Sequence, residues 1–331
     1  MNSEHIVLVR TPEGTPQTSD FELGSSTLPA LQPGQVQVKV LALSLDPYLR
    51  SAMAGRHLSA PILPGQVVLG EGLCEVVESL HPRMQPGQLW VAGCGWRSAA
   101  LLDPAAVMAA RPVPAEINPA ALALGVLGMP GLTAWAGVRR LSHCKPGDCF
   151  VVSAASGPVG ATVGQLARWS GCRVVGIAGG PQKCQWVTEV AHFDACIDYQ
   201  AQDLRQALRQ HCPQGINVYF DNVGGEVLQA VCEQLAPQAQ VVLCGLIAQY
   251  GSAAGAGPNP GLYIRARATL RGLVVYDHWD AMPLMRAELL PRLQRGELAY
   301  REDVSQGLAS TPAAFARLMR GHNQGKALVM I

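Results

Sequence analysis

The sequence predicts an α/β protein: a doubly wound parallel sheet joined to a smaller β-rich domain. From about residue 119 onward, short apolar runs alternate with amphipathic stretches of helical spacing, which predicts parallel strands with helices on both faces. The first hundred residues instead show short strand patterns separated by Pro-Gly turns at 33–34, 64–65 and 86–87. A glycine-rich turn between a strand and a helix at 154–160 completes the argument, because such turns belong to nucleotide-binding sheets.

The individual elements follow from the same patterns. In the β-rich part we expect strands at 6–10, 35–42, 67–77 and 88–92. In the α/β part we expect strands at 149–154, 173–178, 195–198, 217–221, 239–246 and 270–276. Helices are expected between them at 158–170, 181–192, 201–211, 225–236 and 281–295, and the tail ends in an apolar strand.

The turn after the first of these α/β strands has the features of a pyrophosphate site. Gly157 would let the chain reverse tightly, Gly160 would let the backbone approach a diphosphate, and Gly164 would let the helix pack close to the sheet. Pro158 suits the first helical turn, and the helix N-terminus offers N–H groups and a positive dipole end. Glycines at this spacing also occur in ordinary turns, so the flanking strand and helix carry the prediction, which assigns the phosphates to Gly157, Pro158, Val159 and Gly160.

The end of the next strand favours NADPH over NADH. An NAD site usually has an acidic residue there for the adenosine ribose, whereas this chain has small residues at 178–180 and then Lys183. Gly179 leaves room for a 2′-phosphate, and Lys183 with nearby helix-start N–H groups would neutralise it. Lys183 is equally readable as a solvated helix lysine, so the missing carboxylate is the stronger half of the argument.

Composition narrows the class of protein. The chain has 331 residues, 49% hydrophobic and 15% charged, which predicts folded domains with ample core. A net charge of +1 gives no reason to expect nucleic acid or an anionic membrane as partner. We expect neither a signal peptide at the N-terminus nor a membrane-spanning segment. The ten cysteines contain no CxxC pair, which argues against a zinc lobe and, with no export signal, predicts a reducing cytoplasm.

Several longer motifs give the chain a family resemblance. They are SLDPYLR at 44–50, GMPGLTAW at 128–135, AASGPVG at 154–160, GIAGGPQKC at 176–184, FDNVGGE at 220–226, CGLIAQY at 244–250, GLVVY at 272–276 and GHNQGK at 321–326. Together they resemble the zinc-independent medium-chain dehydrogenase/reductase superfamily, and within it the prostaglandin, 2-alkenal and curcumin double-bond reductases. The resemblance implies a GroES-like substrate domain at 1–125 and 300–331, a Rossmann NADPH domain at 126–299, an active site in the cleft, and a homodimer.

The resemblance also implies roles for individual residues. Lys183 would hold the 2′-phosphate and Tyr199 the adenosine side. The remaining cofactor residues would be Met129, Thr133, Asn222, Cys244, Gly245, Ile247, Tyr250, Leu273, Val274, Val275 and Asn323. Each has a structural alternative: 273–275 is also a plain buried strand, Asn222 a turn residue, and Asn323 a loop cap. Tyr48, Tyr250 and Tyr276 would contact the substrate.

The resemblance implies chemistry without a metal. Asp46 stands where zinc-dependent relatives have a ligand cysteine, and VLGEG at 68–72 lacks their ligand histidine, so we expect no metal site. Hydride transfer to a C=C bond conjugated with a carbonyl needs no Lewis acid, because conjugation makes the β-carbon electrophilic. The protein must supply alignment, exclusion of water and hydrogen bonds to the developing enolate.

The proton donor stays open at this point. Tyr250 is one candidate; relatives carry a further tyrosine before the GFVV strand, where this chain has Arg265, with Tyr263 two residues earlier. Tyr263 would be catalytic or a packing residue, Arg265 would bind an oxyanion, or water would deliver the proton. We assign no role to any histidine.

Three functions compete. The leading one is an NADPH-dependent reductase of α,β-unsaturated aldehydes or ketones. The alternatives are a quinone reductase of the same superfamily and a catalytically lapsed NADPH-binding sensor. The small-residue segment 251–261 is expected to be mobile and to close over the ligand, or to be a plain surface loop.

Overall fold

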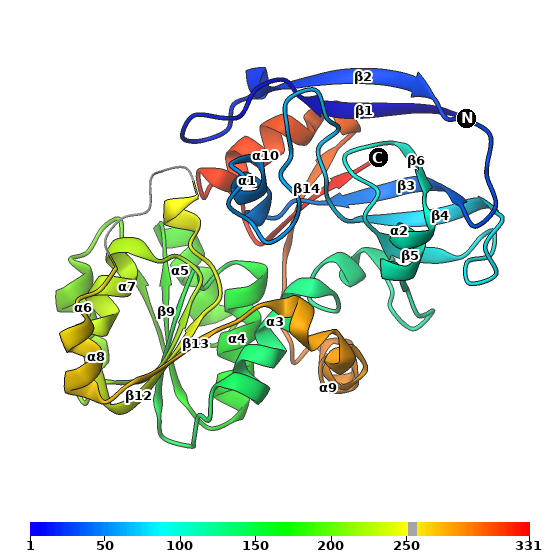
Figure 1. Ribbon diagram of the computed structural model, residues 1–331. Coiled ribbons are helices and arrows are strands. Elements are labelled where there is room, and N and C mark those ends of the chain that lie inside the picture. Colours follow the sequence, from blue (N-terminus) through cyan, green and yellow to red (C-terminus); the bar gives the residue numbers. More distant parts are fainter. Residues whose placement is uncertain (251–256) are drawn as a thin grey trace. The chain divides into compact units, whose positions relative to one another are not determined.

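The computed structural model describes residues 1–250 and 257–331, and these divide into two compact units. Unit 1 comprises Met1–Gly125 and Glu302–Ile331, and unit 2 comprises Val126–Arg301. The α/β fold with a separate β-rich part is confirmed (Figure 1). Each unit is described by itself below.

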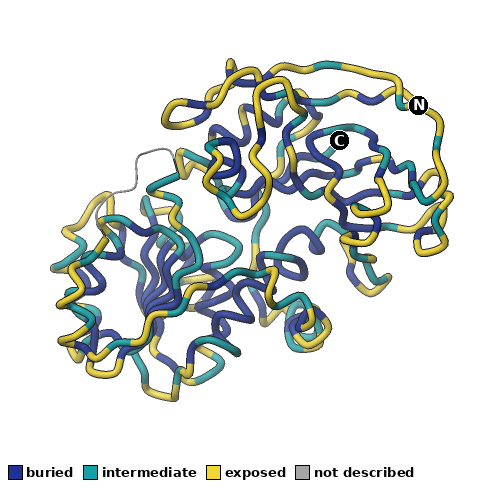
Figure 2. Tube along the Cα trace, in the orientation of Figure 1, coloured by how far each residue is buried: buried dark blue, intermediate teal, exposed yellow. Residues whose placement is uncertain are grey.

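Unit 2 is built around a six-stranded parallel sheet. Its strands are β8 (Cys149–Ser153), β9 (Arg173–Ala178), β10 (Ala195–Asp198), β11 (Ile216–Asp221), β12 (Leu235–Leu243) and β13 (Thr269–Gly272), in the order β10-β9-β8-β11-β12-β13. The chain moves outward in one direction from β8 and in the other from β11, so these two central strands form the topological switch point where dinucleotides bind. The central strands are almost wholly buried, as Figure 2 shows.

Helices cover both faces of this sheet, as in a doubly wound fold. One face is covered by α6 (Leu204–His211), α7 (Gly225–Cys232) and α8 (Pro260–Ala266), whose apolar residues share one core cluster with the strands (Figure 1). On the other face lie α3 (Met129–Ala136), α4 (Pro158–Trp169) and α5 (Pro181–Glu189). The unit also holds a π-helix, η3 (Gly137–Leu141), two 3-10 helices, η4 (Ile247–Gln249) and η5 (Val275–Ala281), and α9 (Met282–Gln294).

Three sequence predictions in unit 2 were wrong in extent. The strand expected at 239–246 is β12, which begins at Leu235 and ends at Leu243. The helix expected at 225–236 ends at Cys232, because the residues from Leu235 onward join β12 beside β11. The strand expected at 270–276 ends at Gly272. Leu273 still donates its N–H to Leu243 O at 2.8 Å, but β12 ends at Leu243 and the chain then enters η5.

Unit 1 contains a two-stranded and a seven-stranded sheet. The first pairs β1 (Asn2–Leu8) with β2 (Phe21–Thr27). The second has the order β14-β15-β3-β4-β5-β7, with β6 beside β3. Its members are β3 (Val36–Ser44), β4 (Gly72–Ser79), β5 (Leu89–Ala92), β6 (Ala99–Leu102), β7 (Arg111–Pro112), β14 (Glu302–Gln306) and β15 (Lys326–Met330).

Three short helices accompany these sheets: α1 (Tyr48–Met53), α2 (Pro104–Ala109) and α10 (Thr311–Met319). The strand expected at 67–77 is wrong in its first half. Val68 donates its N–H to Ile6 O at 3.0 Å, so this stretch bonds to β1, and β4 begins only at Gly72.

The predicted loop at 251–261 falls largely on 251–256, which lie outside the described residues. Its last two residues, Pro260 and Gly261, belong to α8.

Candidate active site

The carboxyl ends of β8 and β11 are joined by the side chain of Asn222. Its amide nitrogen donates to Ser153 O at 2.8 Å, and its backbone N–H donates to Ser153 Oγ at 2.8 Å. Ser153 is the last residue of β8, and Asn222 directly follows β11. The side chain predicted to contact the cofactor is therefore fixed across the switch point of the sheet.

A buried carboxylate holds the loop that follows β11. Asp221 is fully buried and accepts hydrogen bonds from the hydroxyls of Ser153 at 2.9 Å and Tyr219 at 2.6 Å. The same carboxylate accepts the backbone N–H groups of Val223 and Gly224, at 3.0 and 3.1 Å. Burial of the Tyr219 phenol, together with the nearby Asp221 carboxylate, raises the pKa of Tyr219 well above its usual value. Sequence reasoning missed Asp221; the signal was a carboxylate ending an apolar strand just before Val-Gly-Gly.

The glycine turn between β8 and α4 differs from its prediction in one respect. The left-handed residue is Ala154, with φ of +49°, whereas Gly157 has an ordinary φ of −79°. Gly160 lies so near the end of β8 that a Cβ there would sit 2.4 Å from Ala154 O. A Cβ on Gly164 would lie 1.8 Å from the ring of Phe193, which precedes β10, so this glycine allows Phe193 to pack closely on α4.

The start of α4 is suited to an anion. Gly157 occupies the N-cap without a side-chain hydrogen bond, and the first helical bond runs from Ala161 N–H to Gly157 O at 2.9 Å. The N–H groups of Val159 and Gly160 precede that bond and have no intrahelical partner. A helix start without a side-chain cap, next to a glycine with no room for a Cβ, fits the pyrophosphate of a dinucleotide.

A second helix start lies at the end of β9. Gly180 has φ of +89° and forms the N-cap of α5, again without a side-chain cap. Tyr199 covers the preceding glycine: a Cβ on Gly179 would lie 3.0 Å from the Tyr199 hydroxyl. Lys183 is half-buried in the first turn of α5. The structure therefore brings the predicted adenosine residues to one turn.

Asp198 was missed at this turn because it comes from another strand. It ends β10, and its Oδ1 accepts the N–H groups of Gly180 at 2.9 Å and Gln200 at 3.0 Å. Both bonds hold main chain on either side of the turn. Asp198 therefore shapes the turn, although no acidic residue follows β9 itself.

The predicted residues after β12 form a loop packed on the loop after β11. The N–H groups of Cys244 and Gly245 donate to Asp221 O at 2.8 and 3.1 Å. Burial raises the pKa of the Cys244 thiol to about 12, so this thiol stays protonated at neutral pH. Tyr250 turns back over the loop, and its hydroxyl oxygen accepts the Leu246 N–H at 3.3 Å.

The other predicted cofactor residues of unit 2 lie on two further segments. Met129 and Thr133 share the first turns of α3, where the Thr133 hydroxyl donates to Met129 O at 2.8 Å. Leu273 is buried, and Val274 and Val275 are half-buried, where β13 passes into η5. Ile247 donates its N–H to Asn222 O at 3.4 Å, which joins it to the switch-point loop.

The predicted residues of unit 1 gather around its own sheet. Tyr48 begins α1, and its ring stacks on His57 with centroids 4.8 Å apart. Partial burial lowers the pKa of His57, which favours a neutral ring. Asn323 caps its own loop, donating from its amide nitrogen to Gly325 O at 2.7 Å.

Comparison with known proteins decides the family. Residues 4–110 match a model described as the N-terminal domain of oxidoreductase, and residues 158–290 match one described as zinc-binding dehydrogenase. The chain is 37% identical to the NADPH-dependent curcumin reductase of Escherichia coli, covering 98% of this chain and 96% of that protein. It is 35% identical to the NADP-dependent 2-alkenal reductase of Nicotiana tabacum, covering 100% and 98%. The chain belongs to the medium-chain dehydrogenase/reductase superfamily.

A solved relative agrees over the same length. The structure of CurA from Vibrio vulnificus in complex with NADPH matches with a TM-score of 0.92 and 36% identity, covering 99% of this chain and 98% of that one. The named relatives place the chain within the group of NADPH-dependent double-bond reductases, as the sequence motifs predicted.

Tyr263 and Arg265, the two residues that we considered near the proton-transfer step, both lie on α8 and contact the end of α7. Tyr263 is on α8, packed against the apolar cluster under α7, with its hydroxyl 3.6 Å from Cys232 Sγ. Desolvation and this thiol raise the pKa of Tyr263. Arg265, on the same helix, donates to Glu233 O at the end of α7. Both contacts join α8 to the end of α7. The geometry therefore favours the packing alternative for Tyr263, and it makes Arg265 a side-chain cap for the carbonyl group of Glu233 at the end of α7.

Tyr276 does not belong to the core. It lies on η5 with 42% of its surface exposed, and its ring lies 6.1 Å from that of Trp279. A role in substrate contact stays a prediction for this residue.

Asp46, which we predicted to stand where zinc-dependent relatives have a ligand cysteine, is paired with a lysine. Lys326 Nζ donates to Asp46 Oδ1 at 2.6 Å. Among residues 1–250 and 257–331, no three His, Cys, Asp or Glu side chains come together as metal ligands. None of the helices in these ranges is long and apolar enough to cross a membrane.

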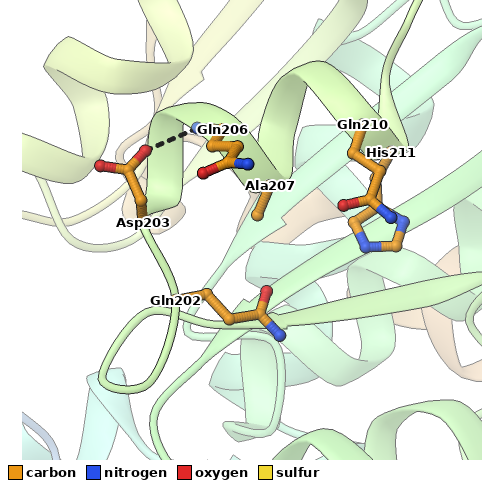
Figure 3. A pocket seen from close by; sticks show the side chains of 6 residues that line it. All are labelled: Gln202, Asp203, Gln206, Ala207, Gln210 and His211. Atoms are coloured by element: carbon orange, nitrogen blue, oxygen red, sulfur yellow. Dashed lines mark hydrogen bonds between the residues drawn. The ribbon is translucent and has the colours of Figure 1, made fainter.

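One surface hollow is lined by none of the residues predicted for the site, although its Gln202 donates its N–H to Asp198 O at 3.0 Å. It measures about 330 Å³ and is lined by six residues from α6 and the turn before it: Gln202, Asp203, Gln206, Ala207, Gln210 and His211 (Figure 3). The Asp203 carboxylate is already bound to the Gln206 N–H at 2.7 Å, as the cap of α6. We therefore assign no ligand to it.

Proposed function

We propose that this protein is an NADPH-dependent reductase of the C=C bond in α,β-unsaturated aldehydes or ketones, acting without a metal. The observation that carries the proposal is the near-full-length similarity to a curcumin reductase and a 2-alkenal reductase. The substrates named for both relatives hold a C=C bond conjugated with a carbonyl group. The proposal assigns the same reaction class, and not either substrate, to this chain.

The adenosine half of NADPH is bound at the two uncapped helix starts. The start of α4, from Gly157 to Gly160, receives the pyrophosphate. Lys183 and the first N–H groups of α5 receive the 2′-phosphate, with Tyr199 over Gly179 beside the adenosine. NADPH is preferred because this turn provides a cation and helix-start N–H groups.

The nicotinamide half follows the edge of the sheet. Asn222 is held at the switch point by Ser153. The loop from Cys244 to Tyr250 begins beside it, where the Cys244 and Gly245 N–H groups bond to Asp221 O. The main chain of 273–275 meets the carboxamide, and Met129, Thr133 and Asn323 contact the same half. The bound cofactor supplies a hydride to the substrate's β-carbon.

The protein's remaining task is to stabilise the enolate oxygen. The Tyr250 oxygen accepts the Leu246 N–H, which leaves its O–H proton available for donation. Burial raises the pKa of Tyr250, so the phenol stays protonated at neutral pH. We assign Tyr250 as the hydrogen-bond donor to the substrate oxygen and Tyr48 as a substrate contact.

The compartment, oligomeric state and partners are proposed from the same family resemblance. We propose a cytoplasmic homodimer that has a small-molecule enal or enone as its partner and binds no nucleic acid. All ten cysteines are free thiols, which suits a reducing compartment.

An assay of NADPH consumption over matched substrates tests the function. The panel pairs each enal or enone with its saturated analogue and adds quinones as a separate class. We expect NADPH to be oxidised in the presence of enals and enones. Mass spectrometry should then show products that are two hydrogens heavier than the substrate and that retain the carbonyl group. Turnover confined to quinones would assign the rival activity, and binding of NADPH without turnover of any member would contradict the proposal.

A further inference from the structure

Eight of the ten cysteines form four contacting pairs that the proposed reaction does not use. In each pair the neighbouring thiol is the main cause of a shift in its partner's pKa: Cys74 with Cys94, Cys144 with Cys172, Cys149 with Cys212, and Cys184 with Cys196. All of them are reduced in the structure. Contacting thiols are the starting geometry for disulfide formation.

Exposure separates one pair from the other three. Cys184 and Cys196 are both half-buried, whereas each other pair contains at least one buried cysteine. A small oxidant must reach sulfur before it can react. Cys184 and Cys196 are therefore the accessible pair.

The fold aims these two side chains at each other. Cys196 on β10 is the register partner of Gly176 on β9, and the Gly176 Cα faces Val187 of α5. Cys196 therefore lies on the sheet face that α5 covers, and Cys184 is in the first half of α5. Both thiols also reach the main chain of Ala178, and Cys184 Sγ lies 3.9 Å from Ala178 O.

The position of the two sulfurs sets the order of reaction. Cys196 lies on the sheet face beneath α5 and Cys184 lies on α5 itself, so Cys184 is the attacking sulfur and Cys196 the resolving one. The neighbouring Cys196 thiol also lowers the pKa of Cys184, which favours its reactive thiolate form.

We propose that Cys184 and Cys196 form a reversible disulfide that weakens NADPH binding, with a peroxide as the oxidant. The Cys184 thiolate attacks a peroxide oxygen, the O–O bond breaks, and water leaves after protonation, which gives a sulfenic acid. The Cys196 sulfur then attacks the Cys184 sulfur and releases the second oxygen as water. Two thiols lose two protons and two electrons, and one hydrogen peroxide becomes two water molecules.

The position of the pair links its oxidation to the cofactor, and this step depends on the proposed function. Lys183 directly precedes Cys184, and Asp198, which holds the Gly180 and Gln200 N–H groups, is two residues after Cys196. A disulfide is about 2.05 Å long, much shorter than a thiol hydrogen bond, so its formation draws α5 toward β10. That movement displaces Lys183 from the 2′-phosphate. Loss of one charge-assisted bond weakens binding about tenfold.

The test oxidises the intact protein with graded hydrogen peroxide and locates disulfides by differential alkylation and mass spectrometry. We expect a Cys184–Cys196 linkage at the lowest effective dose, slower in saturating NADPH and reversed by dithiothreitol. Fluorescence titration should show about tenfold weaker NADPH binding after oxidation, and NADH binding should change less. Cys184→Ser and Cys196→Ser should each abolish the linkage and the loss, while Cys149→Ser/Cys212→Ser, the matched control, should keep both.

The outcomes separate the two proposals. If Cys184 and Cys196 stay fully alkylatable while another pair oxidises, the disulfide is excluded. If the linkage forms and NADPH binding is unchanged, the link to the cofactor is excluded. Failure of reduced protein to bind NADPH would instead overturn the proposed function, and the disulfide mapping would still stand or fall by itself.

Discussion

Lys326 and Asp46 form a buried ion pair inside unit 1, with 2.6 Å between Nζ and Oδ1. Their exposed fractions are 2% and 8%, and Lys326 Nζ also donates to Leu45 O at 3.0 Å. The Ser44 hydroxyl bonds the other oxygen of the same carboxylate. The pair therefore ties the C-terminal GHNQGK motif to the SLDPYLR motif, which are 280 residues apart.

Removing one partner of this pair should destabilise unit 1 strongly. Lys326→Met leaves a buried carboxylate without its cation, and we expect a loss of about 3 to 5 kcal/mol in the free energy of unfolding. Urea unfolding measures it. The double variant Asp46→Asn/Lys326→Met should lose less free energy of unfolding than the sum of the two single variants. In the double variant both charges are removed, so no unpaired charge stays buried. Additive losses would show that the pair is not coupled.

Gly160→Ala should damage the cofactor site through backbone displacement. Its Cβ would lie 2.4 Å from Ala154 O, and main chain cannot yield as a flexible side chain can. We expect weaker binding of both NADPH and NADH by about tenfold or more, measured by fluorescence titration, because both carry the pyrophosphate.

Gly157→Ala and Gly164→Ala are the matched controls for that variant. Gly157 has ordinary φ, and its Cβ would lie 3.3 Å from Ala154 O, so its effect on affinity should be smaller. Gly164→Ala meets the Phe193 ring and should lower the melting temperature, with partial rescue by Phe193→Leu. Equal losses of affinity at Gly157 and Gly160 would contradict the close-approach argument.

The sheet of unit 2 was predictable because its pattern is local. The strands β8 and β9 hold uninterrupted apolar runs, such as Val174 to Ala178, and the helices beside them have their own periodicity. Element ends were less predictable, because β13 ends where its partner β12 ends, and that is a property of the pairing. In unit 1, the short strands β6 and β7 are defined by their neighbours and leave little trace in the sequence.

The candidate site divides in the same way. Gly160 and Lys183 are recognisable from local spacing. The partners that fix them are not: Asp198 reaches the Gly180 turn from another strand, and Ser153 meets Asn222 from 69 residues away. Such contacts depend on strand order, which the sequence pattern alone does not specify.

Lys183→Ala should separate the two cofactors. NADPH binding should weaken about tenfold or more through loss of a charged contact to the 2′-phosphate, and NADH binding should stay nearly unchanged. Parallel titrations of both cofactors measure the difference. Lys183→Arg, which keeps the charge, should retain most of the preference; an equal loss for NADH would overturn the assignment.

Prolonged chelation should leave turnover intact. The prediction depends on our interpretation that Asp46 replaces the ligand cysteine of zinc-dependent relatives, and on its ion pair with Lys326. Activity is measured before and after dialysis against EDTA, together with the metal content of the purified protein. Stoichiometric zinc that leaves together with activity would disprove it.

The final prediction compares three tyrosines by kinetics and stability. Tyr250→Phe removes the proposed donor to the enolate, so we expect the turnover number to fall by roughly 10² if it resembles loss of one oxyanion donor. Tyr48→Phe removes a ground-state contact and should raise KM more than it lowers kcat. Tyr263→Phe loses the contact with Cys232 and should lower the melting temperature with little change in turnover.

The Tyr250 hydroxyl also accepts the Leu246 N–H in the cofactor loop, so NADPH affinity must be measured for that variant. Unchanged affinity with reduced kcat would locate the effect at the substrate.

The raised pKa of Tyr250 means that the folded protein holds this proton more tightly than the unfolded chain does. Its contribution to stability is therefore present below the unfolded value of about 10 and is lost as the pH rises through the folded value. Wild-type kcat should accordingly show no inflection from this phenol at neutral pH. An unaltered turnover number in Tyr250→Phe would remove Tyr250 from the reaction and leave water as the proton source.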